Sequence, residues 1–140
     1  MLLLNSNLIN KLKELQKGWG VMDKQILKES GIYYEELMER VMGKKELLER
    51  FLNKFVDMKL IDELSNLKTS ESNYEYFLYV HNLKDVSGTL GMHELYKTSA
   101  ELEEKIRSNE TDTQDLLEKL RENLDKLYNG IIKARDYQGA

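Results

Sequence analysis

The chain contains neither cysteine nor proline. Without cysteine it can form no disulfide, no thiolate zinc site and no cysteine nucleophile, which is typical of proteins of a reducing compartment such as the cytoplasm. The absence of proline, together with abundant leucine, glutamate and lysine, favours helices throughout. At 140 residues the chain is long enough for one domain with its own hydrophobic core. We therefore expect an all-α protein located in the cytoplasm.

Long apolar runs and clustered basic charge are also missing. No stretch approaches the roughly 20 apolar residues that cross a bilayer, and residues 1–5 lack the basic leader and extended apolar run of a secretory signal. The 21 basic and 25 acidic residues are interspersed and give a formal net charge of −4. Nucleic-acid-binding proteins usually cluster their basic residues on one face. We therefore expect a soluble protein that contacts neither membrane nor nucleic acid.

Apolar residues recur at helical spacing along most of the chain. The spacing predicts short helices at residues 8–15, 21–30 and 34–41, one long helix at 44–64, a helix after 72 that Ser70 or Ser72 caps, and helices with apolar residues at 92–106 and 116–131. Four long helices with short connections predict an antiparallel four-helix bundle with additional short N-terminal helices. We divide the chain into an N-terminal helical extension, residues 1–30, and the bundle, residues 31–140.

His81 lies in the middle of the helix that follows residue 72. At about 100° per residue, its face is shared by Tyr74, Phe77, Leu78, Lys84, Asp85 and Gly88. The opposite face carries apolar, aromatic and small residues that can pack in the bundle, so we expect His81 to face outward. Apolar Phe77 and Leu78 on a solvated face indicate a partner-binding surface. Gly88 removes a side chain where such a partner would approach closely.

An exposed imidazole beside a cation suits a phosphoryl carrier. Neutral imidazole is nucleophilic near neutral pH and can hold a phosphoryl group until an acceptor takes it. Lys84, one turn from His81, can offer its ammonium to that anion. The other histidine, His93, has the setting of a solvated surface residue, and a helix break separates it from His81, which argues against a shared metal site. The charged runs at residues 101–107 and 118–126 indicate solvated helix faces.

The stretch from His81 to Gly91 resembles the histidine-containing phosphotransfer (HPt) domain family of bacterial-type phosphorelays. The hallmark of that family is His-x-Leu-Lys-Gly, followed by small residues and a second glycine. The matching residues are His81, Leu83, Lys84, Ser87, Gly88, Leu90 and Gly91. Leu95 and residues 100–103 match the helix that follows, and upstream segments match as well, so the similarity covers roughly residues 31–135.

The resemblance implies a role for each of these site residues. His81 is the phosphoacceptor, Lys84 helps to hold the phosphoryl group, and the face with Tyr74, Phe77, Leu78 and Gly88 docks a response-regulator receiver domain. By this resemblance, the carrier would have no kinase activity and no cofactor of its own, because the receiver would supply the aspartate and the magnesium ion. It passes phosphoryl groups between receivers, or between a hybrid sensor histidine kinase and a regulator.

Asp85 departs from the family, which usually has glycine at this position. Its carboxylate lies one turn from His81 and can accept a hydrogen bond from the imidazole, which would fix the tautomer of the ring. The same charge would repel an incoming phosphoryl group by about 2–3 kcal/mol at an effective dielectric of ~20. Two other hypotheses therefore stay open. One is a degenerate HPt-like docking module that binds a receiver or kinase without efficient transfer, and the other is a purely structural helical bundle or adaptor.

Overall fold

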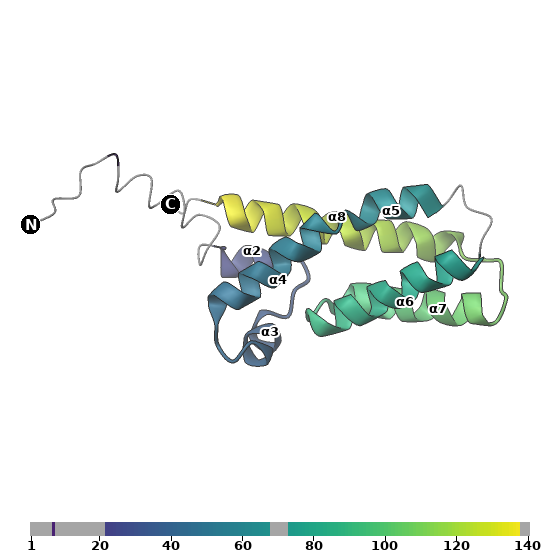
Figure 1. The fold of residues 1–140 in the computed structure, drawn as a ribbon, viewed down its shortest axis with the longest axis horizontal. Helices are drawn as coiled ribbons and strands as arrows, with labels where there is room; N and C mark the ends of the chain where they lie inside the picture. Colours follow the sequence, from purple (N-terminus) through teal and green to yellow (C-terminus); the bar gives the residue numbers. More distant parts are fainter. Residues whose placement is uncertain (1–6, 8–21, 68–72, 138–140) are drawn as a thin grey trace, which may run out of the picture.

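The computed structural model describes residue 7 and residues 22–67 and 73–137, and the regular structure within these ranges is helical (Figure 1). The helices are α2 (Lys24–Glu29), α3 (Tyr34–Arg40), α4 (Lys45–Asp57), α5 (Leu60–Leu67), α6 (Asn73–Thr89), α7 (His93–Arg107) and α8 (Gln114–Asp136). No helix in the described part is both long and apolar enough to cross a membrane. The predicted helix at residues 8–15 and the predicted caps Ser70 and Ser72 lie outside the described residues.

The predicted all-α antiparallel four-helix bundle is confirmed. Its four rods are α4 continued by α5, then α6, α7 and α8, with α2 and α3 as the additional short helices at one end (Figure 1). Fully buried side chains come from every rod, among them Leu48, Leu52, Phe55, Leu64, Leu83, Leu95, Leu102, Leu120, Leu124 and Ile131. Burial of such side chains is the main source of stability in a helical bundle. The division at residue 30 stays a prediction.

The single long helix predicted at residues 44–64 is wrong, because the chain breaks between α4 and α5. Lys59 has a φ of +50°, in the left-handed region that side chains rarely adopt. Two tyrosines hold the peptide that follows. The N–H of Leu60 donates to the hydroxyl of Tyr128 (2.6 Å), and the hydroxyl of Tyr79 donates to the carbonyl of Leu60 (2.7 Å). Packing against α6 and α8 therefore stabilises the bend.

Helix α3 is joined to the C-terminal end of α6, the helix that carries His81. The guanidinium of Arg40 donates to the carbonyls of Gly88 (2.5 Å) and Thr89 (2.8 Å). These carbonyls belong to the last turn of α6, where they have no partner within the helix. The N–H of Tyr33 donates to the carbonyl of Gly91 (3.0 Å), whose φ of +67° turns the chain into α7. The end of the histidine helix is thus fixed from outside the bundle.

His93 is exposed, as the sequence indicated, and its ring also makes two contacts at the start of α7. Its ring stacks on Tyr33 with the centroids 3.8 Å apart, and its Nε2 lies 2.5 Å from Oε2 of Glu36. Arg40 pairs with the other carboxylate oxygen of Glu36 at 2.9 Å. The hydrogen bond to His93, assisted by the charges of His93 and Arg40, lowers the pKa of Glu36. This cluster links α3 to the start of α7.

The lowered pKa of Glu36 makes this link sensitive to acid. The stability that it contributes is fully present above the carboxyl pKa of the unfolded chain, about 4.3, and is lost as pH falls through the lower pKa of the folded state. We expect Glu36→Gln to lose less stability than the wild type between pH 6 and pH 3, measured by urea unfolding. Glu39→Gln, an exposed change on the same helix, should behave as the wild type. Equal acid sensitivity of wild type and Glu36→Gln would contradict this prediction.

Candidate functional site

His81 lies in the middle of α6 with 45% of its side chain exposed. Its two ring nitrogens face two carboxylates. Nδ1 is 2.7 Å from Oε1 of Glu103 on α7, and Nε2 is 3.5 Å from Oδ2 of Asp85 on α6. The ring also stacks on Phe77, with the centroids 5.9 Å apart and the planes at 12°. The histidine is therefore held on one side and open to solvent on the other.

Glu103 is a nearly buried carboxylate, only 3% exposed, that receives three side chains. Besides Nδ1 of His81, Nζ of Lys84 lies 2.6 Å from its Oε2, and a guanidinium nitrogen of Arg107 lies 3.3 Å from its Oε1. Burial opposes the ionisation of Glu103, but the hydrogen bonds from Lys84 and His81 outweigh it and lower the pKa of the carboxyl. The same hydrogen bond, between Lys84 and Glu103, raises the pKa of Lys84. Glu103 is therefore an anion at neutral pH.

The contact with Glu103 decides which nitrogen of His81 carries the hydrogen. An ionised carboxylate only accepts hydrogen bonds, so Nδ1 carries the hydrogen in the 2.7 Å contact. In the neutral ring the lone pair is then on Nε2, the nitrogen that faces away from Glu103. A carboxylate bound to the rear nitrogen also fixes the orientation of the ring. In the neutral ring, Nε2 is therefore the nitrogen with a free lone pair, on the side of the ring away from Glu103.

Glu103 is the site residue that sequence reasoning missed. The charged run at residues 101–107 indicates a solvated face, and this prediction is wrong for Glu103, which is buried. The apolar positions of α7 carried a signal, because Leu95, Ser99, Leu102 and Ile106 define the inner face and residue 103 completes their spacing. A carboxylate on the inner face of a helix requires a partner, and here it has three.

The residues predicted to share the face of His81 do lie around it. Tyr74 and Leu78 are exposed, whereas Phe77 is half-buried beneath the guanidinium of Arg107, which lies 5.7 Å from the centre of its ring. Lys84 is bound to Glu103, and Asp85 is 63% exposed. A Cβ at Gly88 would come within 3.1 Å of the ring of Tyr96. Gly88 thus also lies close to an exposed ring of α7 within the molecule.

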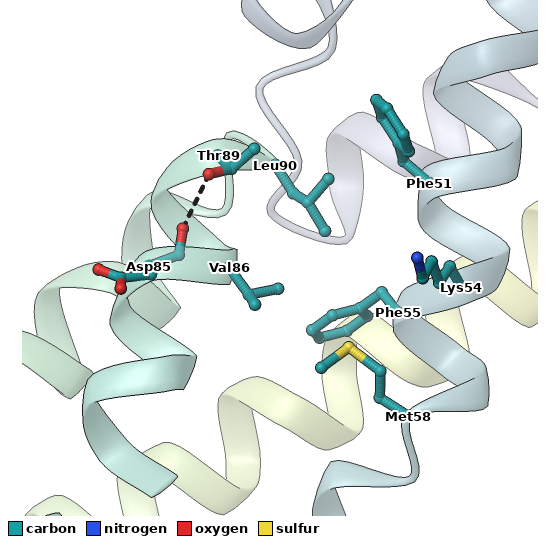
Figure 2. Close-up of a pocket in the computed structure, with 8 residues that line it drawn as sticks. All are labelled: Phe51, Lys54, Phe55, Met58, Asp85, Val86, Thr89 and Leu90. Carbon is teal, nitrogen blue, oxygen red and sulfur yellow. Dashed lines mark hydrogen bonds between the residues drawn. The ribbon is translucent and has the colours of Figure 1, made fainter. Parts of the chain in front are cut away.

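An apolar hollow of about 340 Å³ lies between α4 and α6, next to the site. Figure 2 shows Phe55, Met58 and Val86 gathered around it, while the carboxylate of Asp85 points away from it. The remaining lining residues are Phe51, Lys54, Thr89 and Leu90. The surface beside His81 therefore combines a charged side, toward α7, and an apolar side, toward α4.

The fold and the site together define a helical bundle with one oriented, partly exposed histidine on its surface. Within the described ranges, no group of three or more His, Asp or Glu side chains is arranged to hold a metal ion. The Hpt domain family matches residues 46–130, which include α4 to most of α8 and the histidine. The chain therefore belongs to the Hpt domain family, as the sequence motif indicated. Comparison with curated proteins and with solved structures gives no match.

The Hpt domain family has a general function in signalling. Hpt domains are phosphotransfer carriers of two-component signalling that interact with receiver domains and kinases, and they are not kinases themselves. His81 lies inside the matched range, and its ring is oriented by the buried carboxylate of Glu103.

Proposed function

We propose that the protein is a phosphorelay carrier that accepts a phosphoryl group on Nε2 of His81 and passes it to the aspartate of a response regulator. The donor is a receiver domain or a hybrid sensor histidine kinase. The 2.7 Å contact between Nδ1 of His81 and Glu103 carries the proposal, because it leaves the lone pair on the exposed nitrogen. In each transfer an N–P bond replaces an aspartyl O–P bond, or the reverse.

The charges around His81 suit a phosphoryl group that stays for a limited time. Lys84 and Arg107 are both bound to Glu103 and lie on the α7 side of the ring. An ammonium has three donors and a guanidinium five, so each cation retains donors for a phosphoryl oxygen while it pairs with Glu103. We assign Lys84 the main part in stabilising the phosphoryl group, because it is only one turn from His81.

The exposed face around His81 is the proposed docking surface for the receiver. Tyr74, Phe77, Leu78 and Gly88 would contact the partner, and the hollow between α4 and α6 extends this surface with apolar area. Apolar surface beside a polar centre is typical of partner-binding sites. The magnesium ion that phosphoryl transfer requires would come with the receiver, and the transfer would take place in the cytoplasm.

The test is incubation with a purified, phosphorylated receiver domain, followed by detection of acid-labile phosphate on the protein. We expect label on the wild type and none on His81→Gln, because the glutamine amide is not a nucleophile. Co-purification with the receiver without label would favour the degenerate docking module. Neither label nor binding would leave a structural bundle. Circular dichroism of the variant should match the wild type, which separates loss of the nucleophile from loss of the fold.

Asp85 should slow this transfer. Its Oδ2 lies 3.5 Å from Nε2, so its charge opposes the approach of a phosphoryl group to the nucleophile. We expect Asp85→Gly to accelerate phosphorylation of His81 by a phosphorylated receiver, measured as initial rate of label uptake. Because glycine costs about 1 kcal/mol within a helix, Asp85→Ala should be measured beside it. An unchanged or slower rate in both variants would show that the carboxylate is not inhibitory.

A further inference from the structure

We propose that the same face also hydrolyses the acyl phosphate of the receiver, with His81 and Asp85 together holding the attacking water. The inference rests on the proposed function, because it requires a phosphorylated receiver docked over His81. It goes beyond phosphoryl transfer, since the product is inorganic phosphate rather than a phosphorylated histidine.

The spacing of the two acceptors carries the inference. Nε2 of His81 and Oδ2 of Asp85 are 3.5 Å apart, longer than the roughly 2.9 Å of a good N–H···O hydrogen bond. One water that donates one hydrogen to each, at about 2.8 Å, can bridge acceptors at this separation. Both hydrogens of that water point at the protein, so its lone pairs point outward. Both side chains are open to solvent, at 45% and 63% exposure, so water can enter.

Glu103 orients the first acceptor, and helical spacing places the second beside it. Glu103 binds Nδ1 of His81 and leaves Nε2 as an acceptor, as described above. Asp85 lies one helical turn after His81, in a segment where the hydroxyl of Thr89 donates to the carbonyl of residue 85 at 2.9 Å (Figure 2). The carboxylate of Asp85 points away from the apolar hollow, so a partner seated on the hollow leaves it accessible.

Electrostatics favours the water over direct attack. The negative charge of Asp85 repels the phosphoryl group when it comes into contact with Nε2, whereas a neutral water can occupy the space between them. The water oxygen then forms the new O–P bond as the aspartyl O–P bond breaks, and the carboxylate of the receiver leaves. The proton released from water passes to the acceptor pair and then to solvent. The receiver supplies its own magnesium ion, and no oxidant or further reactant is needed.

The inference is particular to this chain. The family usually has glycine at position 85, and a glycine offers no second acceptor beside the histidine. A carrier with glycine there can hold a water only through the imidazole. Asp85, the residue that departs from the family motif, is therefore the one that supplies the second acceptor for the water.

The experiment follows phosphate release from a purified phosphorylated receiver with magnesium, in water enriched in ¹⁸O. Wild type, Asp85→Ala and the matched control Asp125→Asn, an exposed change on α8, are compared. Label on His81 is measured in the same samples. We expect wild type and Asp125→Asn to release ¹⁸O-containing phosphate at least about tenfold faster than Asp85→Ala, in line with one positioned proton acceptor. Uptake of label by His81 should be faster in Asp85→Ala, as proposed above for the loss of the carboxylate.

A second measurement excludes hydrolysis through the phosphorylated histidine. Isolated phospho-His81 protein should lose its phosphate slowly and equally in wild type and Asp85→Ala, because Asp85 lies beside the departing nitrogen and not on the opposite side of phosphorus. Equal phosphate release by the wild type and Asp85→Ala, with His81 labelled in both, would overturn the inference and leave the carrier function intact. Decay of phospho-His81 as fast as phosphate release would also overturn it. A wild type that neither takes up label nor releases phosphate would overturn both.

Discussion

Glu103→Ala is expected to slow phosphoryl uptake by His81 roughly 100-fold, although neither His81 nor any exposed residue changes. Glu103 fixes the hydrogen on Nδ1 and the orientation of the ring through a 2.7 Å contact. Without it, the ring can rotate and either nitrogen can carry the hydrogen, so the reactive arrangement becomes one of several. A loss of about 10²-fold is typical when a reacting group is misplaced by about 1 Å. Initial rates of label uptake from a phosphorylated receiver measure the effect.

The glutamine variant separates orientation from charge. Glu103→Gln can still accept from Nδ1–H through its amide oxygen, so we expect it to retain more activity than Glu103→Ala. Glu104→Ala is the matched control, because Glu104 is exposed and its one ion pair, with Arg107, is long at 3.9 Å. This variant should transfer at the wild-type rate. Nitrogen chemical shifts of His81 report the tautomer directly, with Nδ1–H expected in the wild type and a mixture in Glu103→Ala. A wild-type rate in Glu103→Ala would remove the buried carboxylate from the mechanism.

The fold followed from the sequence to the extent that it depends on local periodicity. Apolar spacing predicted the helices and their bundle, but it continues without interruption across residues 58–60 and so concealed the bend between α4 and α5. The bend depends on the hydroxyls of Tyr79 and Tyr128, which reach the peptide of Leu60 from other helices. No local pattern contains such contacts between distant residues.

The difference between local spacing and contacts between distant residues also explains which parts of the site the sequence predicted. Lys84 and Asp85 were placed beside His81 correctly because helical geometry alone brings residues three and four apart together. Glu103 comes from the next helix, and its contact with His81 depends on how α6 and α7 pack against each other. The spacing of apolar residues could place residue 103 on the inner face of α7, but it could not say which residue of α6 lies opposite. That contact between helices is the one that orients the ring of His81.

The largest expected effect on stability comes from Gly130→Ala, at the crossing of α2 and α8. A Cβ at Gly130 would lie 1.7 Å from Oγ and 2.3 Å from Cβ of Ser30, the C-cap residue of α2. Rotation of the Ser30 hydroxyl would move its Oγ but not its Cβ, so the clash between this Cβ and the new Cβ at residue 130 would remain. Helix α2 would therefore have to move. Such overpacking typically costs 1–3 kcal/mol, against a gain of about 1 kcal/mol from helix propensity. Because separations of 1.7 and 2.3 Å place the cost at the upper end of that range, we expect a net loss of about 2 kcal/mol and a melting temperature roughly 6–10 °C lower.

Gly88→Ala provides the matched control, since it makes the same change inside α6. There the new Cβ would meet only the ring of Tyr96, at 3.1 and 3.3 Å, and that exposed ring can move aside. We expect its stability to lie within about 1 kcal/mol of the wild type. Ser30→Gly should rescue Gly130→Ala in a double-mutant cycle, because it removes the atoms that clash. A Gly130→Ala protein as stable as Gly88→Ala would show that α2 does not pack directly on Gly130. With rescue, the close approach of α2 and α8, rather than any property of glycine within α8, would explain why a side chain is excluded there.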